Sequence, residues 1–182
     1  MMRMSKIHVI NNGIEIKLFA NGEAKDRLSK TLITVGRLAA IKNPKLILQI
    51  MGVLKGKGYK LIWVGTGELE KEIRQNIEKN GLTKYITMLG VRKDVNKLLQ
   101  TASVFLLPSI SEGFSIATLE AQAAGLPCIV SDTVPRDVDC GLCTFVPLNE
   151  SPEVWAEIID LVAMGKDKQR LDLNKLQAFS TE

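Results

Sequence analysis

The sequence predicts a three-layer α/β/α fold in which a parallel sheet of about six strands lies between two layers of helices. From residue 31 onward, short apolar runs alternate with longer amphipathic stretches, which is the pattern that β-α units produce. With 182 residues, 46% hydrophobic and 24% charged, the chain has the length and composition of one globular domain. We expect that domain over 31–165, after a hinge or linker over 1–30 and before a tail over 166–182.

Six apolar runs have the length and the β-branched content of buried parallel strands, and the sixth is the weakest. The predicted strands are Thr31–Val35, Lys60–Val64, Tyr85–Leu89, Ser103–Leu107, Pro127–Ser131 and Thr144–Leu148. Between them, Pro44 and Pro152 suit first helical turns, and Gly56, Gly81 and Gly125 suit helix ends. The predicted helices are Pro44–Lys55, Glu68–Lys79, Asp94–Thr101, Ser115–Ala124 and Pro152–Met164.

Charge, hydropathy and cysteine content limit the ligands and the location that we expect for this chain. A formal net charge of +4 and a pI near 9.0 favour anionic ligands, but no basic block or basic-aromatic pattern indicates nucleic acid. No run approaches the roughly 20 apolar residues of a membrane span, and the start lacks a secretion signal. We expect a cytoplasmic location, with peripheral contact at the inner membrane surface left open.

Cys140 and Cys143 have C-x-x-C spacing without the second pair of a zinc site, so structural thiols are favoured.

In open parallel sheets, ligands bind in the loops that follow the carboxyl ends of strands. The first such loop contains Gly36, Arg37 and Lys42, and its two cations could flank a diphosphate. The second contains Gly65 and Gly67, which would let a ligand approach the backbone closely, although a tight turn alone explains them better.

Glu112 and Glu120 form an E-x7-E pair across a predicted strand-to-helix turn. The amides of Gly113, Phe114 and Ser115 at the helix start can bind an anion, and a carboxylate can accept hydrogen bonds from sugar hydroxyls. Such a pair also occurs by chance on solvated helices. Glu120, however, is the only charge in 116–124, so we expect it to lie in an apolar surface and to require a partner.

Together these residues resemble the nucleotide-sugar-binding C-terminal half of GT-B glycosyltransferases, specifically the retaining family GT4 of polysaccharide and glycolipid synthesis. The likeness runs from about Asn11 to Met164, and its order and spacing are more specific than any one piece. The matching pieces are Asn11-Asn12-Gly13, Gly36-Arg37 with Lys42, Gly65-Thr66-Gly67, Leu89-Gly90, Pro108-Ser109 with Glu112-Gly113-Phe114, and Glu120-Ala121 with Ala124, Gly125 and Pro127. The resemblance implies a Rossmann-like domain.

The resemblance also implies the role of each candidate residue. Glu112, Arg37 and Lys42 would be the catalytic set, in which the two cations neutralise the donor diphosphate and Glu112 holds donor-sugar hydroxyls. Glu120 would accept from the ribose hydroxyls. Gly113 and Phe114 would present backbone amides near the phosphates and sugar, Thr118 and Leu119 would lie beside the phosphates, and Val91 and Arg92 would border the base. The implied donor-binding set also includes Gly36, Gly65 and Gly67.

By the same resemblance, the substrate is a nucleotide sugar, with a UDP-sugar ahead of GDP- or ADP-sugars, and neither a metal nor a cofactor is expected. The acceptor would be a glycan or a lipid-linked sugar. Because a GT-B enzyme uses an N-terminal domain for its acceptor, this chain alone is expected to be inactive. The sequence departs from the family pattern at Asn11, where proline is usual, and at 133–137, which lack a glycine pair and a glutamate.

Other functions stay open on the sequence alone. The chain could be a non-catalytic nucleotide-sugar-binding regulatory module, or one half of a sugar-nucleotide epimerase. A dinucleotide-dependent dehydrogenase is less favoured, because no G-x-G-x-x-G follows the first predicted strand.

Overall fold

The structure is a computed structural model that describes residues 13–20, 28–165 and 169–181. Its centre is one six-stranded parallel sheet with the order β3-β2-β1-β4-β5-β6. This order is that of the Rossmann fold, so the predicted fold class is confirmed. The strands are β1 (Thr31–Val35), β2 (Lys60–Val64), β3 (Ile86–Gly90), β4 (Val104–Leu107), β5 (Cys128–Ser131) and β6 (Cys143–Val146).

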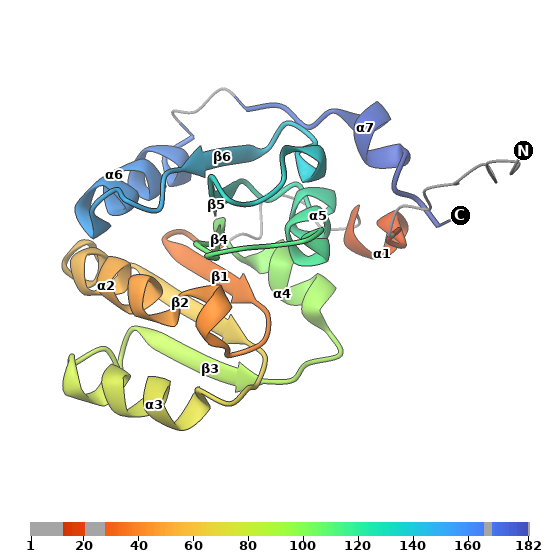
Figure 1. The fold of residues 1–182 in the computed structure, drawn as a ribbon. Coiled ribbons are helices and arrows are strands. Elements are labelled where there is room, and N and C mark those ends of the chain that lie inside the picture. The colour runs from red at the N-terminus through yellow and green to blue at the C-terminus, as the bar shows by residue number, and fades with distance from the viewer. Residues whose placement is uncertain (1–12, 21–27, 166–168, 182) are drawn as a thin grey trace, which may run out of the picture.

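Helices cover both faces of the sheet (Figure 1). One face packs against α2 (Pro44–Leu54), α3 (Glu70–Lys79) and α6 (Pro152–Ala163), and the other against α1 (Ile16–Ala20), α4 (Val95–Thr101) and α5 (Ile116–Ala123). Three short 3₁₀ helices (Ala40–Lys42, Lys55–Lys57 and Arg136–Val138) and the C-terminal α7 (Leu173–Gln177) complete the described elements. No helix in these ranges is long and apolar enough to cross a bilayer.

The element boundaries follow local chemistry. β1 and β2 have the predicted bounds, whereas the other elements differ from prediction by one or two residues at an end. The predicted sixth strand extends to Leu148, but β6 ends at Val146 because Pro147 has no N–H to donate to β5. All residues of β4 and β5 are buried, as expected for strands in the middle of a parallel sheet.

Parts of the predicted linker and tail pack against the domain. The carbonyl oxygens of Leu18 and Phe19 in α1 accept hydrogen bonds from Asn96 (3.0 Å) and Gln100 (2.8 Å) of α4. In the tail, the N–H of Asp172 donates to the carbonyl oxygen of Cys140 at 2.7 Å. Asn11 and Asn12 of the predicted hinge lie outside the described residues.

Gln122 holds α5 against the segment that precedes β6. Its side chain is fully buried, and its amide nitrogen donates to the carbonyl oxygens of Val138 (2.8 Å) and Thr118 (3.3 Å). Its amide oxygen accepts from the N–H groups of Cys140 (2.7 Å) and Leu142 (3.4 Å). One side chain thus supplies partners to buried backbone groups that have no sheet neighbour to pair with.

We expect Gln122→Ala to lower the free energy of unfolding by about 2 to 4 kcal/mol, because it leaves a cavity and unpaired backbone groups. Denaturant titration measures this change. Gln49→Ala is the matched control, since Gln49 is exposed on α2 and should shift stability by less than about 0.5 kcal/mol. Equal effects of the two substitutions would contradict the structural role of Gln122.

Candidate functional site

The candidate site lies where the strand order reverses, between β1 and β4. The loop after β1 and the loop after β4 leave the sheet side by side, because these strands pair directly. A backbone hydrogen bond from the N–H of Ile110 to the carbonyl oxygen of Ile41, at 2.8 Å, joins the two loops. Residues from two distant parts of the sequence therefore meet at one point.

Lys42 and Glu112 form an ion pair at this junction. Lys42 Nζ lies 2.5 Å from Glu112 Oε1, and the two side chains are only 23% and 10% exposed. The Lys42 side chain also passes over Gly36, where an added Cβ would lie 3.4 Å from Lys42 Cε. The structure thus brings together Gly36, Lys42 and Glu112. An ion pair with so little exposure is screened by water less than a surface pair.

Arg37, the other predicted cation, points elsewhere. Its guanidinium donates to Glu68 Oε2 at 3.1 Å, and the two side chains are 73% and 52% exposed. Such a pair contributes little to stability, so Arg37 can exchange Glu68 for another anion at small cost. The structure gives no contact between Arg37 and Glu112, and its catalytic role stays a prediction.

Gly65 and Gly67 are explained by the neighbouring backbone. An added Cβ at Gly65 would collide with the carbonyl oxygen of Gly36, and one at Gly67 would collide with the backbone of Leu38. Leu38 also exchanges hydrogen bonds with this loop, donating to the carbonyl oxygen of Thr66 at 3.0 Å. The close approach that these glycines permit is therefore that of the loop after β1, and a contact with a ligand stays a prediction.

The start of α5 presents backbone N–H groups beside Glu112. Ser115 is the N-cap; its hydroxyl accepts from the N–H of Thr118 at 3.4 Å and lies 2.8 Å from Thr118 Oγ1. Among the described residues, the N–H groups of Gly113, Phe114 and Ser115 have no hydrogen-bond partner. These amides and the positive end of the helix form a region where an anion is stabilised.

Glu120 lies on α5 one turn further on, with its side chain partly buried. No side chain or backbone group in the described ranges forms a hydrogen bond or ion pair with its carboxylate. Burial raises the pKa of Glu120 above its ordinary value of 4.5. The Glu120 carboxylate is therefore partly shielded from water, and its expected partner is not among the protein groups of the described ranges.

Thr118 and Leu119 are fully buried. Thr118 Oγ1 is bonded to the Ser115 hydroxyl, and Leu119 packs in the core on the α5 side of the sheet. Their side chains therefore face the interior. The predicted position beside the phosphates could involve only their backbone, and it stays a prediction.

Val91 and Arg92 follow β3 and line an open hollow of about 490 Å³ at the start of α4. Val91 is 76% exposed, and Arg92 is exposed as well. Arg92 forms two hydrogen bonds with Asp94, at 2.8 and 2.7 Å, and this contact lowers the pKa of the Asp94 carboxyl. The predicted contact of Val91 and Arg92 with a base stays a prediction.

The burial of the Ser109 side chain escaped the sequence analysis. Ser109 lies in the loop after β4, and its buried hydroxyl has no hydrogen-bond partner among the described residues. Its carbonyl oxygen accepts from the hydroxyls of Ser131 (2.6 Å) and Thr133 (2.7 Å), which attaches this loop to the one after β5. The Pro108-Ser109 dipeptide was the available signal, but burial of the hydroxyl depends on the neighbouring strands.

Asp137 and Asp139 have the Asp-x-Asp spacing of some metal sites, which the sequence analysis overlooked. Asp139 Oδ1 accepts from the N–H groups of Gly141 (2.7 Å) and Cys143 (3.2 Å), so it stabilises a turn. Within the described ranges, no cluster of three or more His, Cys, Asp or Glu side chains could hold a metal ion. Cys140 is buried, and burial raises its pKa to about 11, so its thiol stays protonated at neutral pH.

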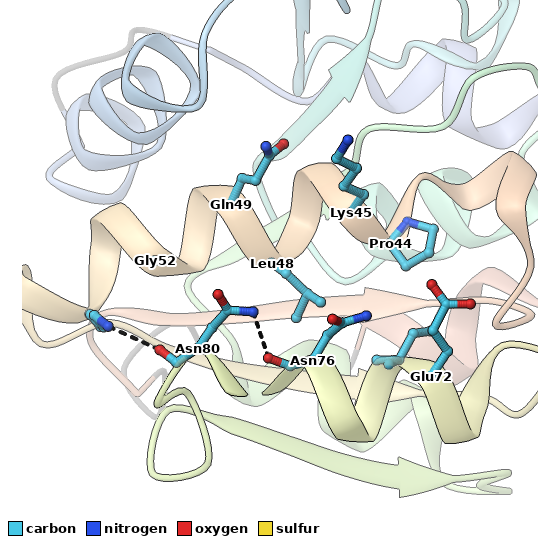
Figure 2. Close-up of a pocket in the computed structure, with 10 residues that line it drawn as sticks. Pro44, Lys45, Leu48, Gln49, Gly52, Glu72, Asn76 and Asn80 are labelled. Carbon is cyan, nitrogen blue, oxygen red and sulfur yellow. Dashed lines mark hydrogen bonds between the residues drawn. The ribbon is translucent and has the colours of Figure 1, made fainter. Parts of the chain in front are cut away.

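A larger hollow of about 520 Å³ lies between α2 and α3 (Figure 2). Leu48 points from α2 toward α3, whereas Lys45 and Gln49 point away from that helix (Figure 2). Polar groups in this groove already bond to one another, as Asn80 does with the carbonyl oxygen of Asn76 at 2.6 Å. It contains no paired, shielded charges comparable to those between β1 and β4, so we place the candidate site at the latter.

The fold and the two joined loops define a Rossmann-like α/β domain with a candidate ligand site at the strand-order reversal. The sequence matches the family described as Glycosyl transferases group 1 over residues 29–164, and the chain belongs to this family.

Two curated relatives and one solved structure place the chain more closely. It is 34% identical over 183 residues to the Bacillus subtilis (strain 168) protein that bears the glycosyltransferase name EpsF, covering 92% of this chain and 48% of that protein. It is 35% identical over 142 residues to the Escherichia coli UDP-Gal:alpha-D-GlcNAc-diphosphoundecaprenol alpha-1,3-galactosyltransferase, covering 70% of this chain and 37% of the enzyme. The chain thus spans half or less of these relatives. Anabaena HepE, solved with UDP and glucose, shares the fold (TM-score 0.76, 20% identity, 95% of this chain and 53% of that one).

We expect Glu120→Gln to stabilise the ligand-free chain at neutral pH. The pKa of Glu120 is higher in the folded than in the unfolded chain, so the unfolded chain releases this proton first as the pH rises. The stability that depends on the protonated carboxyl is therefore present at pH values below 4.5 and is lost as the pH rises through the folded pKa. Thermal unfolding across this range should show the variant gaining over the native chain as the pH increases. The exposed Glu157 provides the control, and a native-like pH profile for Glu120→Gln would contradict the prediction.

Proposed function

We propose that this chain forms the donor-binding lobe of a glycosyltransferase that transfers a sugar from a nucleoside diphosphate sugar, with a UDP-sugar favoured over GDP- and ADP-sugars. The observation that carries the proposal is the shielded Lys42–Glu112 pair between β1 and β4, beside the free amides of 113–115. Membership of the glycosyltransferase family supports the reaction class. The E. coli relative is named for a UDP-sugar, and HepE was solved with UDP, which supports the choice of base.

The diphosphate would lie between Lys42 and the start of α5. A lysine ammonium has three N–H donors, so Lys42 can keep Glu112 as a partner while it binds a phosphate oxygen. When the sugar–phosphate bond breaks, negative charge grows on the departing diphosphate. Lys42 and the N–H groups of Gly113 and Phe114 would stabilise that charge, and Arg37 can add a second cation when it leaves Glu68.

The carboxylates would bind the hydroxyl groups at either end of the diphosphate. Glu112 lies at the ion pair, so it is placed to accept from hydroxyls of the transferred sugar while Lys42 contacts the adjoining phosphate. Glu120 has no protein partner in the described ranges, and the ribose hydroxyls would supply one. Val91 and Arg92 would border the base, next to the hollow that they line.

The acceptor is proposed to be a glycan or a lipid-linked sugar, bound largely by a second GT-B domain. This chain spans 48% and 37% of the two curated relatives, which supports a two-domain enzyme. The E. coli relative is named for an acceptor carried on diphosphoundecaprenol, which supports a lipid-linked acceptor. The proposed location is the cytoplasmic face of a membrane, through peripheral contact.

Lys42 and Glu112 provide the first test of donor binding. We expect UDP to bind without added magnesium, and Lys42→Gln combined with Glu112→Gln to weaken binding by about 1 to 3 kcal/mol, because charge-assisted hydrogen bonds are lost. Replacing both residues avoids leaving one buried charge unpaired. Isothermal titration calorimetry with UDP, GDP and ADP measures the affinities.

Lys45→Gln is the matched control, because it removes a nearby lysine that is exposed on α2. It should bind UDP like the native chain. Binding that strictly needs a divalent metal, or no binding to any of the three diphosphates, would sink the proposed donor site.

Transfer is the second test. We expect the chain alone to bind donor and to transfer no sugar, because orientation and exclusion of water require a second domain opposite the site. A radiolabelled UDP-sugar assay should show transfer only when a matched N-terminal GT-B domain and an acceptor are added. Transfer by the chain alone would contradict the two-domain proposal, and binding without rescue by any N-terminal domain would favour a regulatory module.

A further inference from the structure

The C-terminal segment 169–181 packs across the α5 side of the domain. Its helix α7 has Leu176 buried in the same core as α5, and the ammonium of Lys175 donates to the carbonyl oxygen of Asp139 at 3.2 Å. Beyond α7, Ser180 pairs with Ile14, which precedes α1 (Figure 1). The tail is thus docked along its described length.

Ile14 holds the end of this segment. Its N–H donates to the carbonyl oxygen of Phe179 at 2.9 Å, and its own carbonyl oxygen accepts from the N–H of Thr181 at 3.2 Å. These bonds form a parallel bridge between Ile14 and Ser180. Gly13 permits the close approach, because an added Cβ would lie 2.5 Å from Thr181 Cγ2 and 3.0 Å from the carbonyl oxygen of Phe179.

The ring of Phe179 then contacts the loop after β4. Its centroid lies 5.4 Å from that of Phe114, with the ring planes tilted by 45°, a favourable geometry for an aromatic pair. Phe114 is flanked by Gly113 and Ser115, whose N–H groups point to no protein acceptor in the described ranges. Nothing lies within 4 Å of the position of a Cβ on Gly113, so the loop has open space there. Phe114 is the apolar side chain of this loop that packs against the core.

We propose that Phe179 is a positioning residue: by packing on Phe114, it holds loop 112–115 in the conformation whose amides receive the donor diphosphate. The identity of that ligand rests on the proposed function, whereas the ordering of the loop does not. Losing the aromatic pair shifts the ratio of ordered to disordered loop by about two- to tenfold. The C-terminal segment 169–181 thereby contacts the site that the loops after β1 and β4 form.

Hydrogen exchange on the ligand-free chain tests the ordering. In Phe179→Ala, backbone amides of 112–116 should exchange about two- to tenfold faster, while those of α2 keep their native rates. Phe179→Tyr retains the ring and should restore native exchange. Leu173→Ala is the control, because Leu173 lies on the same segment and is 68% exposed.

Gly13→Ala perturbs the same contact from the opposite side. Its added methyl pushes on Thr181 and Phe179, so it should raise exchange in 112–116 although both rings remain. Adding Thr181→Ser removes the threonine methyl group that the new Cβ would meet, and it should return exchange toward the native rate.

Calorimetry with UDP completes the test. If the proposed function holds, Phe179→Ala weakens UDP binding by about two- to tenfold and Phe179→Tyr does not. A native chain that binds no nucleoside diphosphate would refute the proposed function, and the exchange rates would still decide the positioning role. Native exchange in 112–116 of Phe179→Ala, or equally faster exchange throughout the chain in both Phe179 variants, overturns the positioning role.

Discussion

Backbone pairing of β1 with β4 places Leu32 beside Val104 and Ile33 beside Phe105, in the middle of the sheet. The contacts between the loops after these two strands depend on this register, because it makes the loops neighbours. The chain then connects them twice, once through the backbone from Ile110 to Ile41 and once through the Lys42–Glu112 pair. The loops after β2 and β5 attach to the same centre through Leu38 and Ser109. The pairing of two buried strands thus determines where the side chains of the candidate site lie.

The charged side chains at this centre differ in how far they are buried and in whether a protein group pairs with them. Arg37 and Glu68 form an exposed pair that water screens, so it costs little to separate. Lys42 and Glu112 are shielded, and removing one of them would leave the other unpaired in a poorly hydrated place. Glu120 is partly buried with no protein partner in the described ranges, and this burial raises its pKa. Lys42 and Glu112 thus form a fixed ion pair, and Arg37 is a cation that can exchange its partner. Glu120 is a carboxylate without a protein partner in the described ranges.

The sequence predicted the sheet well because parallel strands buried on both faces are continuous apolar runs, and β1 and β2 were found to the residue. It also indicated which loops carry the charges, since strand ends follow from the strands. The pairing of Lys42 with Glu112 could not be predicted, because it depends on strand order, and the sequence shows only the order along the chain. The glycines at 65 and 67 pointed to a close approach, but only the structure shows that the neighbouring loop makes it. The docking of α7 could not be predicted either. Its only buried residue is Leu176, which gives no hydrophobic repeat in the sequence, and the contact of Phe179 with Phe114 joins distant parts of the chain.

The unsatisfied groups at the strand-order reversal are of two complementary kinds. The N–H groups of 113–115 and the spare donors of Lys42 can bind acceptors, whereas the carboxylate of Glu120 can bind donors. Elsewhere the protein satisfies such groups itself, as Gln122 does for the backbone on either side of it. An inorganic anion would satisfy only the donors, and a neutral sugar would leave the cation and the amides without a charged partner. A ligand that carries phosphate oxygens between two sets of hydroxyls satisfies both kinds at once, and a nucleoside diphosphate sugar has that arrangement.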